Sequence, residues 1–255
     1  MKPASRVLTS LAKLVQPALS RAGYRLVPLV ATNPALLPRF FHILKRQGFS
    51  PRHVIDVGAN QGDWTRLAVD YFPDATFLLI EPQAELRARV QDLIDRGHKI
   101  EWLTAGASDK SGILEFTINP RADSSTFALS RAQAESLGFS RVMVEVLTLN
   151  DVIRSRGMPP PEMIKIDAEG FDLKVLAGAS DILGITDIIL MEVGIVARGI
   201  ENTAAAVINT MAAAGYRLID ITDVNRSPRD DVLWLCEFAF LRNGSSLLDA
   251  VTTYE

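Results

Sequence analysis

Short apolar runs alternate with amphipathic stretches along most of this 255-residue chain. The runs are rich in β-branched residues and too short for helices, and between them apolar residues recur at helical spacing. Such alternation predicts an α/β domain, with a mostly parallel sheet of seven strands covered by helices on both faces. The expected strands are 53–57, 76–80, 100–103, 163–167, 185–193, 216–221 and 234–241, and the expected helices are 64–71, 83–96, 171–176 and 203–214.

The alternation of strand and helix patterns is interrupted between Gly112 and Leu147. Residues 113–118 and 142–147 alternate with period two, as strands do, and a polar loop and a short helical piece lie between them. We therefore expect a β-rich insertion. With Arg121, Ser124 and Ser125, it is a candidate for acceptor recognition or for a lid, and an ordinary loop is the alternative.

The first 39 residues form a separate segment before a main domain at 40–255. Apolar side chains at Val7, Leu8, Leu11, Leu14, Val15 and Leu19 recur at helical spacing. This pattern predicts an amphipathic helix that Pro17 kinks or splits. Such a helix could lie on the protein's own core, make a homo-oligomer contact or lie on a membrane surface.

Composition excludes several classes of protein. The formal net charge of -3 gives no basic footprint for nucleic acid, so a polyanionic partner is disfavoured. Cys236 is the only cysteine, which rules out an intramolecular disulfide and a multi-thiolate metal site. No apolar run approaches about 18 residues, so we expect neither a signal peptide nor a transmembrane segment, and a cytoplasmic location.

The strongest chemical signal is the turn that follows the first strand, where a ligand of an open α/β sheet would bind. It runs Asp56, Val57, Gly58, Ala59, Asn60, Gln61, Gly62, Asp63. Its glycines allow close approach of a ligand to the backbone, but its acids would repel the diphosphate of a dinucleotide. S-adenosylmethionine has no phosphate and carries positive charge, so it suits Asp56, Gly58, Ala59, Asn60 and Gly62.

Two further segments complete the predicted cofactor site. Glu81 ends the second strand, where a carboxylate can accept hydrogen bonds from both hydroxyls of a ribose. The small residues around Ala107, Ser108 and Asp109 could leave room for adenine and offer an acceptor to its amine. A plain turn is the alternative at this second segment.

Carboxylates also follow the strands on the other side of the sheet. Asp167 and Glu169 end one strand, and Glu192 lies at the end of the next, very apolar strand. Asp167 or Glu169 could act as a base toward an acceptor hydroxyl. Alternatively, Asp167 and Glu192 could share a divalent cation that lowers the pKa of the acceptor.

Together these segments resemble the FkbM family of S-adenosylmethionine-dependent methyltransferases, over residues 53–192. The resemblance rests on the glycine turn, on Glu81-Pro82, on Ala107-Ser108-Asp109 with Gly112, on Ser124-Ser125, on Val146-Leu147-Thr148-Leu149 and most specifically on Lys165-Ile166-Asp167-Ala168-Glu169-Gly170. It implies a Rossmann-like class I methyltransferase fold, a cofactor held by Asp56, Gly58, Asn60 and Glu81, and O-methylation of a hydroxyl in a sugar, glycan or natural product.

Two positions depart from the pattern of that family. Asn150 stands where an acid usually follows Thr-Leu, and Asp172 stands where a glutamate is common.

Two other functions fit parts of the same sequence. A non-catalytic module could keep the cofactor pocket without the chemistry, and a nicotinamide-dependent oxidoreductase would need the same sheet and Glu81 but a different first turn.

Overall fold

The computed structural model describes residues 35–119, 125–196, 200–227, 229–249 and 251. The amphipathic helix expected within the first 39 residues, and Arg121 and Ser124 of the insertion, lie outside these ranges. Residues 40–255 form one compact unit. In the described part of the chain, no helix combines the length and the apolar character that a membrane span requires.

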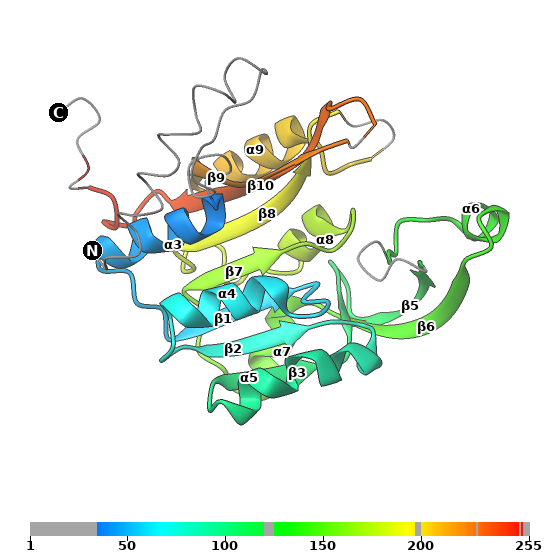
Figure 1. Cartoon of the computed structure of the whole chain (residues 1–255), viewed down its shortest axis with the longest axis horizontal. Coiled ribbons are helices and arrows are strands. Elements are labelled where there is room, and N and C mark those ends of the chain that lie inside the picture. Colours follow the sequence, from blue (N-terminus) through cyan, green and yellow to red (C-terminus); the bar gives the residue numbers. More distant parts are fainter. Residues whose placement is uncertain (1–34, 120–124, 197–199, 228, 250, 252–255) are drawn as a thin grey trace, which may run out of the picture. The chain divides into compact units, whose positions relative to one another are not determined.

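A seven-stranded sheet forms the centre of this unit (Figure 1). Six of its strands run parallel to one another, and β10 is antiparallel to both of its neighbours. In spatial order the strands are β3 (Lys99–Leu103), β2 (Thr76–Ile80), β1 (His53–Val57), β7 (Met163–Ile166), β8 (Ile188–Gly194), β10 (Leu233–Arg242) and β9 (Tyr216–Arg226). The mostly parallel seven-stranded sheet expected from the sequence is confirmed.

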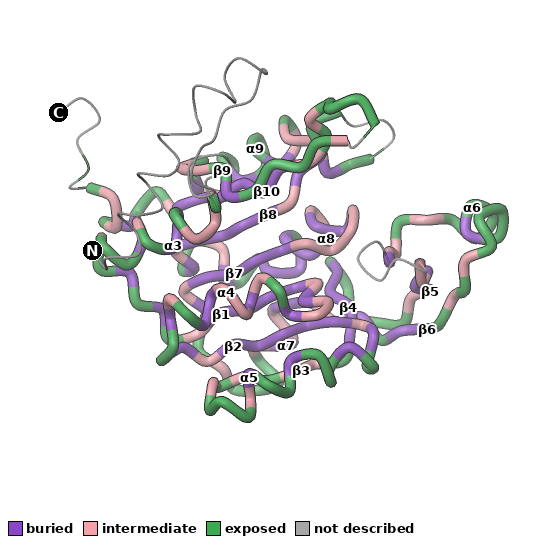
Figure 2. Tube along the Cα trace, viewed as in Figure 1, coloured by how far each residue is buried: buried purple, intermediate pink, exposed green. Residues whose placement is uncertain are grey.

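The central strands are buried on both faces, as Figure 2 shows for β1, β2, β7 and β8. The chain crosses from β1 to β2 through α4 (Asp63–Tyr71), and from β7 to β8, in the opposite direction, through α8 (Asp172–Ala177). Because crossovers between parallel strands are right-handed, opposite directions put the two helices on opposite faces of the sheet. This is the covering that continuous apolar strands require.

Other helices complete the two layers. Phe41, in α3 (Leu36–Arg46), makes edge-to-face contacts with Trp64 and Phe72, so α3 packs beside α4. Beside the main sheet, the structure also describes the helices η1 (Ala84–Val90), α5 (Gln91–Asp95), α7 (Leu149–Arg156) and α9 (Ala204–Ala213).

The β-rich insertion is confirmed as a second, three-stranded sheet. Its order is β4 (Gly106–Ala107), β6 (Ser140–Leu147) and β5 (Gly112–Ile118), and α6 (Arg131–Ser136) lies between β5 and β6 in the chain. Ser130 caps α6, with its hydroxyl accepting from the Gln133 amide and the Gln133 side chain bonding back to the Ser130 amide. The insertion therefore has a sheet of its own next to the main one.

Two helical segments differ from the sequence-based prediction. Residues 83–96 form the 3₁₀ helix η1 followed by α5, and not one α-helix. Arg66 donates to the carbonyl of Arg89, an acceptor that a continuous α-helix would use itself. Helix α7 was not predicted, although Thr148 caps its start and Gly157, with φ 60°, ends it.

The first prediction concerns Tyr216, a buried residue at the start of β9. Its hydroxyl donates to the Thr186 carbonyl at 2.8 Å and accepts from the Gly184 amide at 3.2 Å. Tyr216→Phe keeps the ring but leaves both backbone groups unpaired, and it should lower the free energy of unfolding by about 1 to 3 kcal/mol. Urea unfolding measures the loss, and Tyr71→Phe, at a partly exposed ring, is the control. Equal stability of the two variants would contradict the assigned role.

Candidate active site

The order of the strands reverses between β1 and β7, and ligands of such sheets bind at the carboxyl ends of the strands near that point. The turn after β1 and the turn after β7 both lie here. They are in direct contact, since the Asp167 amide donates to the Val57 carbonyl at 3.1 Å. The predicted cofactor turn and the predicted catalytic turn therefore share one edge of the sheet.

Glycine is required in the first turn for two separate reasons. Gly58 has φ 74°, and a Cβ there would lie 1.8 Å from the Asp167 carbonyl oxygen. Gly62 has φ 79° at the start of α4, and its Cβ would lie 2.4 Å from a methyl group of Val90. Between them Asn60 is also left-handed, with φ 46°. The turn can follow this path only because side chains are missing at Gly58 and Gly62.

Glu81 holds the turn from the end of β2. The residue is 4% exposed, and its carboxylate accepts hydrogen bonds from the backbone amides of Asn60 and Gln83, both at 3.0 Å. Burial raises the pKa of Glu81 in spite of these bonds. The structure thus brings together Glu81 and the turn that contains Asn60, as the sequence predicted.

Asp56 lies in the interior of the domain, near the end of β1. It is fully buried, and Thr65 donates to its carboxylate at 2.6 Å. Its pKa is raised by burial, against the lowering effect of Lys165. Asp56 can therefore act on a cofactor through the shape and charge of the turn above it. Direct contact between its carboxylate and the cofactor remains a prediction.

The third predicted cofactor segment lies where the insertion begins. Ala107 pairs with Leu147 in β6, and the Ser108 amide donates to the Leu147 carbonyl at 3.0 Å. The Ser108 hydroxyl donates to Asp109 at 3.0 Å. A Cβ on Gly178 would lie 2.1 Å from the Ser108 carbonyl oxygen, so this segment packs tightly. A role for Ala107, Ser108 and Asp109 in binding adenine stays a prediction.

Lys165 is a site residue that the sequence-based reasoning did not select. It lies in β7 directly opposite Asp56 in β1, and its side chain is 7% exposed. Its ammonium is 3.0 Å from Asp167 and 3.8 Å from Asp56. Burial lowers the pKa of Lys165, but the charges of Asp167, Asp56 and Glu237 outweigh burial and raise it. A lysine inside an otherwise apolar strand was the available signal.

The second turn carries a cluster of carboxylates. Burial, followed by the charges of Asp167, Glu169 and Asp172, raises the pKa of Glu192 to about 9. These interactions place the three predicted catalytic residues, Asp167, Glu169 and Glu192, within electrostatic range of one another. Because of that pKa, Glu192 keeps its proton at neutral pH and is a hydrogen-bond donor there and not a base.

Two more buried acids belong to this cluster. Asp172 accepts from the backbone amides of Ala168 and Gly170, both at 3.2 Å, and burial with the charge of Asp167 raises its pKa to about 7. Glu237 in β10 lies opposite Glu192 in the neighbouring antiparallel strand β8. The Thr222 hydroxyl donates to the Glu237 carboxylate at 2.6 Å. Burial raises the pKa of Glu237 to about 7. Neither Asp172 nor Glu237 was predicted as a site residue. Glu237 can be recognised in the sequence as an acid within an apolar strand.

A divalent cation shared by Asp167 and Glu192 was the alternative expected from the sequence. In the ranges that the structure describes, no group of three or more His, Cys, Asp and Glu side chains has a metal-binding arrangement. The Lys165 ammonium already provides the positive charge between Asp56 and Asp167. The predicted sharing of a metal by Asp167 and Glu192 therefore has no support in this geometry.

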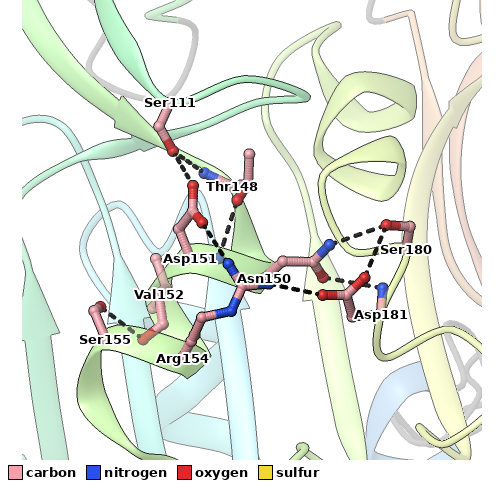
Figure 3. Close-up of polar contacts among 9 residues, drawn as sticks. All are labelled: Ser111, Thr148, Asn150, Asp151, Val152, Arg154, Ser155, Ser180 and Asp181. Atoms are coloured by element: carbon pink, nitrogen blue, oxygen red, sulfur yellow. Dashed lines mark hydrogen bonds and ion pairs between the residues drawn. The ribbon is translucent and has the colours of Figure 1, made fainter.

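Asn150, one of the two departures from the family pattern, has a structural role (Figure 3). Its side-chain amide donates to the Ser180 hydroxyl at 2.9 Å and accepts from the Asp181 amide at 3.1 Å. These bonds connect the first turn of α7 to the segment after α8. On the other side, the Ser111 hydroxyl donates to Asp151 at 2.6 Å, which joins α7 to the start of the insertion.

A mostly parallel seven-stranded sheet with one antiparallel strand, and an acid-flanked glycine turn at its switch point, define a Rossmann-like class I methyltransferase. A family profile described as the methyltransferase FkbM domain matches residues 56–218. The chain belongs to the FkbM methyltransferase family.

Individual related proteins share only a low sequence identity with this chain. Hexuronic acid methyltransferase AglP of Haloferax volcanii is 24% identical over 139 residues, which are 54% of this chain and 54% of that protein. The chain therefore spans about half the length of this curated relative. Among solved structures, the putative RNA methyltransferase PH1948 of Pyrococcus horikoshii has a TM-score of 0.46 at 11% identity, covering 82% of this chain and 84% of that one. The 1,6-didemethyltoxoflavin-N1-methyltransferase of Burkholderia thailandensis has a TM-score of 0.43 at 12% identity, covering 95% and 92%.

The second prediction follows from the protonated state of Glu192. Its folded-state pKa of about 9 lies above the ordinary value, so the stability it contributes is complete at low pH and is lost as the pH rises toward 9. Glu192→Gln should match the wild type at pH 4 and exceed its free energy of unfolding by a margin that grows toward pH 8, at up to about 1.4 kcal/mol per pH unit above the ordinary pKa of a glutamate. Urea unfolding at a series of pH values measures this, with the exposed Glu145→Gln as control. Parallel curves for wild type and Glu192→Gln would show that Glu192 is ionised in the folded protein.

Proposed function

We propose that this chain transfers a methyl group from S-adenosylmethionine to a hydroxyl of a sugar, glycan or related acceptor. One observation carries the proposal: the turn held by Glu81 and the carboxylate turn around Asp167 lie in contact at the switch point of the sheet. A cofactor bound at the first turn would have its reactive group near the second. Family membership supports methyl transfer as the reaction.

The residues of the first turn fit this cofactor. The Glu81 carboxylate accepts from the backbone amides of Asn60 and Gln83 and from the Gln83 side-chain amide, and the free lone pair on its other oxygen can accept from a ribose hydroxyl. Asp56, Asp63 and Glu81 give the region a negative charge that suits a sulfonium and an ammonium and opposes a diphosphate. In the proposal Gly58, Ala59, Asn60 and Gly62 line the cofactor, and Ala107, Ser108 and Asp109 surround its adenine. The bound cofactor supplies an activated methyl group.

In this proposal, the carboxyl groups at and near the second turn have different roles in the reaction. Asp167 is held in place by the Lys165 ammonium at 3.0 Å, and with Glu169 it is the candidate to take the proton of the acceptor hydroxyl. Glu192 retains its proton and can donate a hydrogen bond to a neighbouring acceptor oxygen. Holding the hydroxyl between such groups keeps it in line for displacement at the methyl carbon.

The acceptor class is inferred from one relative and from the polar groups of the site. The relative from Haloferax volcanii is named for a hexuronic acid, and hydroxyl-rich acceptors match a site made of hydrogen-bonding carboxyl groups. We therefore propose carbohydrate hydroxyls as the acceptors to be tested first, with uronic acids and neutral hexoses as separate arms.

The third prediction separates chemistry from cofactor binding. Asp167→Asn should reduce the turnover number at least about 100-fold, the usual size of a lost acid–base group, and leave the affinity for S-adenosylmethionine within about twofold. Formation of S-adenosylhomocysteine with glucuronic acid, glucose and their methyl glycosides measures turnover. The exposed Asp74→Asn is the matched control. Wild-type turnover in Asp167→Asn would remove Asp167 from the mechanism.

The fourth prediction tests the cofactor turn. Glu81→Gln should weaken S-adenosylmethionine binding by about 10- to 100-fold, because one of the hydrogen-bonding oxygens becomes an amide donor. Isothermal titration calorimetry measures the affinity, and the exposed Glu85→Gln on η1 is the control. Unchanged affinity in Glu81→Gln would refute the binding site. Cofactor binding without turnover on any acceptor would favour the non-catalytic module.

A further inference from the structure

One short segment of the insertion touches the catalytic turn directly. The Thr126 hydroxyl donates to the Glu169 carbonyl at 2.7 Å and accepts from the Ala128 amide at 2.9 Å. Both functions of the hydroxyl are used, so its proton has a fixed direction. A contact across 43 positions of sequence thus joins the insertion to the backbone of a predicted catalytic residue.

That backbone is in an unusual conformation. Glu169 has φ 49° and Gly170 has φ 94°, so two consecutive residues are left-handed. For a residue with a side chain this costs about 1 to 2 kcal/mol, and it persists only where the surroundings impose it. Asp172 fixes the turn from one side through the amides of Ala168 and Gly170. Thr126 fixes it from the side of the insertion.

The position of Thr126 is itself determined by aromatic packing. The ring of Phe127 lies 4.6 Å from that of Phe116 and 5.3 Å from that of Phe171, measured between ring centroids. A Cβ on Gly106 would lie 2.5 Å from the Phe127 ring, so the ring fills the space beside β4. The partly buried segment that carries Thr126 is therefore held in place by aromatic packing next to its contact with Glu169.

We propose that Thr126 is a positioning residue of the methyl-transfer site, whose hydroxyl holds Glu169 left-handed and so fixes the direction in which the Glu169 carboxylate leaves the turn. This inference rests on the proposed function, because it concerns the groups that receive the acceptor. The insertion thereby takes part in building the site, in addition to any contact it makes with an acceptor.

The position of the Glu169 charge can be followed without a substrate. The charge of Glu169 is one of those that oppose ionisation of Glu192, so the titration of Glu192 depends on where the Glu169 carboxylate lies. If Thr126 sets that direction, loss of its hydroxyl must displace the titration midpoint of Glu192. A purely structural contact would change stability and leave this midpoint in place.

The chain offers a matched control for the lost hydroxyl. Thr117 and Thr126 form a β-bridge with hydrogen bonds of 2.9 and 3.0 Å between their backbones. Within the described ranges, the buried Thr117 hydroxyl has no hydrogen-bond partner. Thr117→Val therefore makes the same chemical change at the neighbouring position without removing a bond.

The test is a carbon-13 NMR titration of the glutamate carboxyl groups in the full-length chain, with the Glu192 signal assigned from Glu192→Gln. Glu169→Gln gives the size of the shift expected when the Glu169 charge is lost. We expect Thr126→Val to lower the Glu192 midpoint by a measurable part of that shift, and Thr126→Ser and Thr117→Val to keep the wild-type midpoint. Thr126→Ala provides the same measurement should the valine variant not fold.

Turnover completes the test once an acceptor has been found among the sugars named above. Thr126→Val should then lose about tenfold in turnover, roughly the 1.4 kcal/mol of one hydrogen bond, with cofactor affinity unchanged and activity restored in Thr126→Ser. An unmoved Glu192 midpoint in the valine and alanine variants would overturn the proposal, as would a moved midpoint with full turnover. Because the titration needs neither cofactor nor acceptor, failure of the proposed function would be recognised separately.

Discussion

The rest of the site depends on the buried ion pairs of Lys165. Removing charges from water is unfavourable unless they are paired, and this ammonium is paired with one carboxylate at 3.0 Å and has another at 3.8 Å. Asp56 lies near the end of β1, before the predicted cofactor turn, and Asp167 begins the predicted catalytic turn after β7. One lysine therefore joins the two turns to which we assign the cofactor and the acceptor. Gly58 allows the backbones of the two turns to approach each other as well, because a Cβ there would collide with the Asp167 carbonyl.

The site has more carboxyl groups than this single cation can neutralise, and burial decides which of them stay ionised. Glu192, with a pKa raised to about 9 by burial and by its acidic neighbours, keeps its proton, whereas Asp167 faces the ammonium directly. Similar side chains can thus serve as acceptor and donor of a proton in one small space, because their surroundings differ. Asp172 uses its carboxylate for neither task, since it binds the amides of Ala168 and Gly170 and shapes the turn.

Patterns along the chain were sufficient for most of the sheet and for the position of the site. Continuous apolar strands, the glycine turn and the acids at strand ends each have a local signal, and parallel strands bring those ends to one edge. The pairing of Lys165 with Asp56 had no such signal, because it depends on the register between β1 and β7. The break between η1 and α5 likewise depends on Arg66, which lies more than twenty positions from the carbonyl it binds. Interactions between distant segments were the part that periodicity could not reveal.

The two departures from the family pattern can now be given physical roles. Asn150 uses both ends of its amide to join α7 to Ser180 and Asp181, donating to the Ser180 hydroxyl and accepting from the Asp181 amide. Asp172 accepts from the amides of Ala168 and Gly170, four and two positions before it in the turn. Both residues act on the backbone that carries the site and not on a reacting atom. Differences in acceptor choice are therefore better sought in the insertion, whose contact with Glu169 reaches the catalytic turn from outside the main sheet.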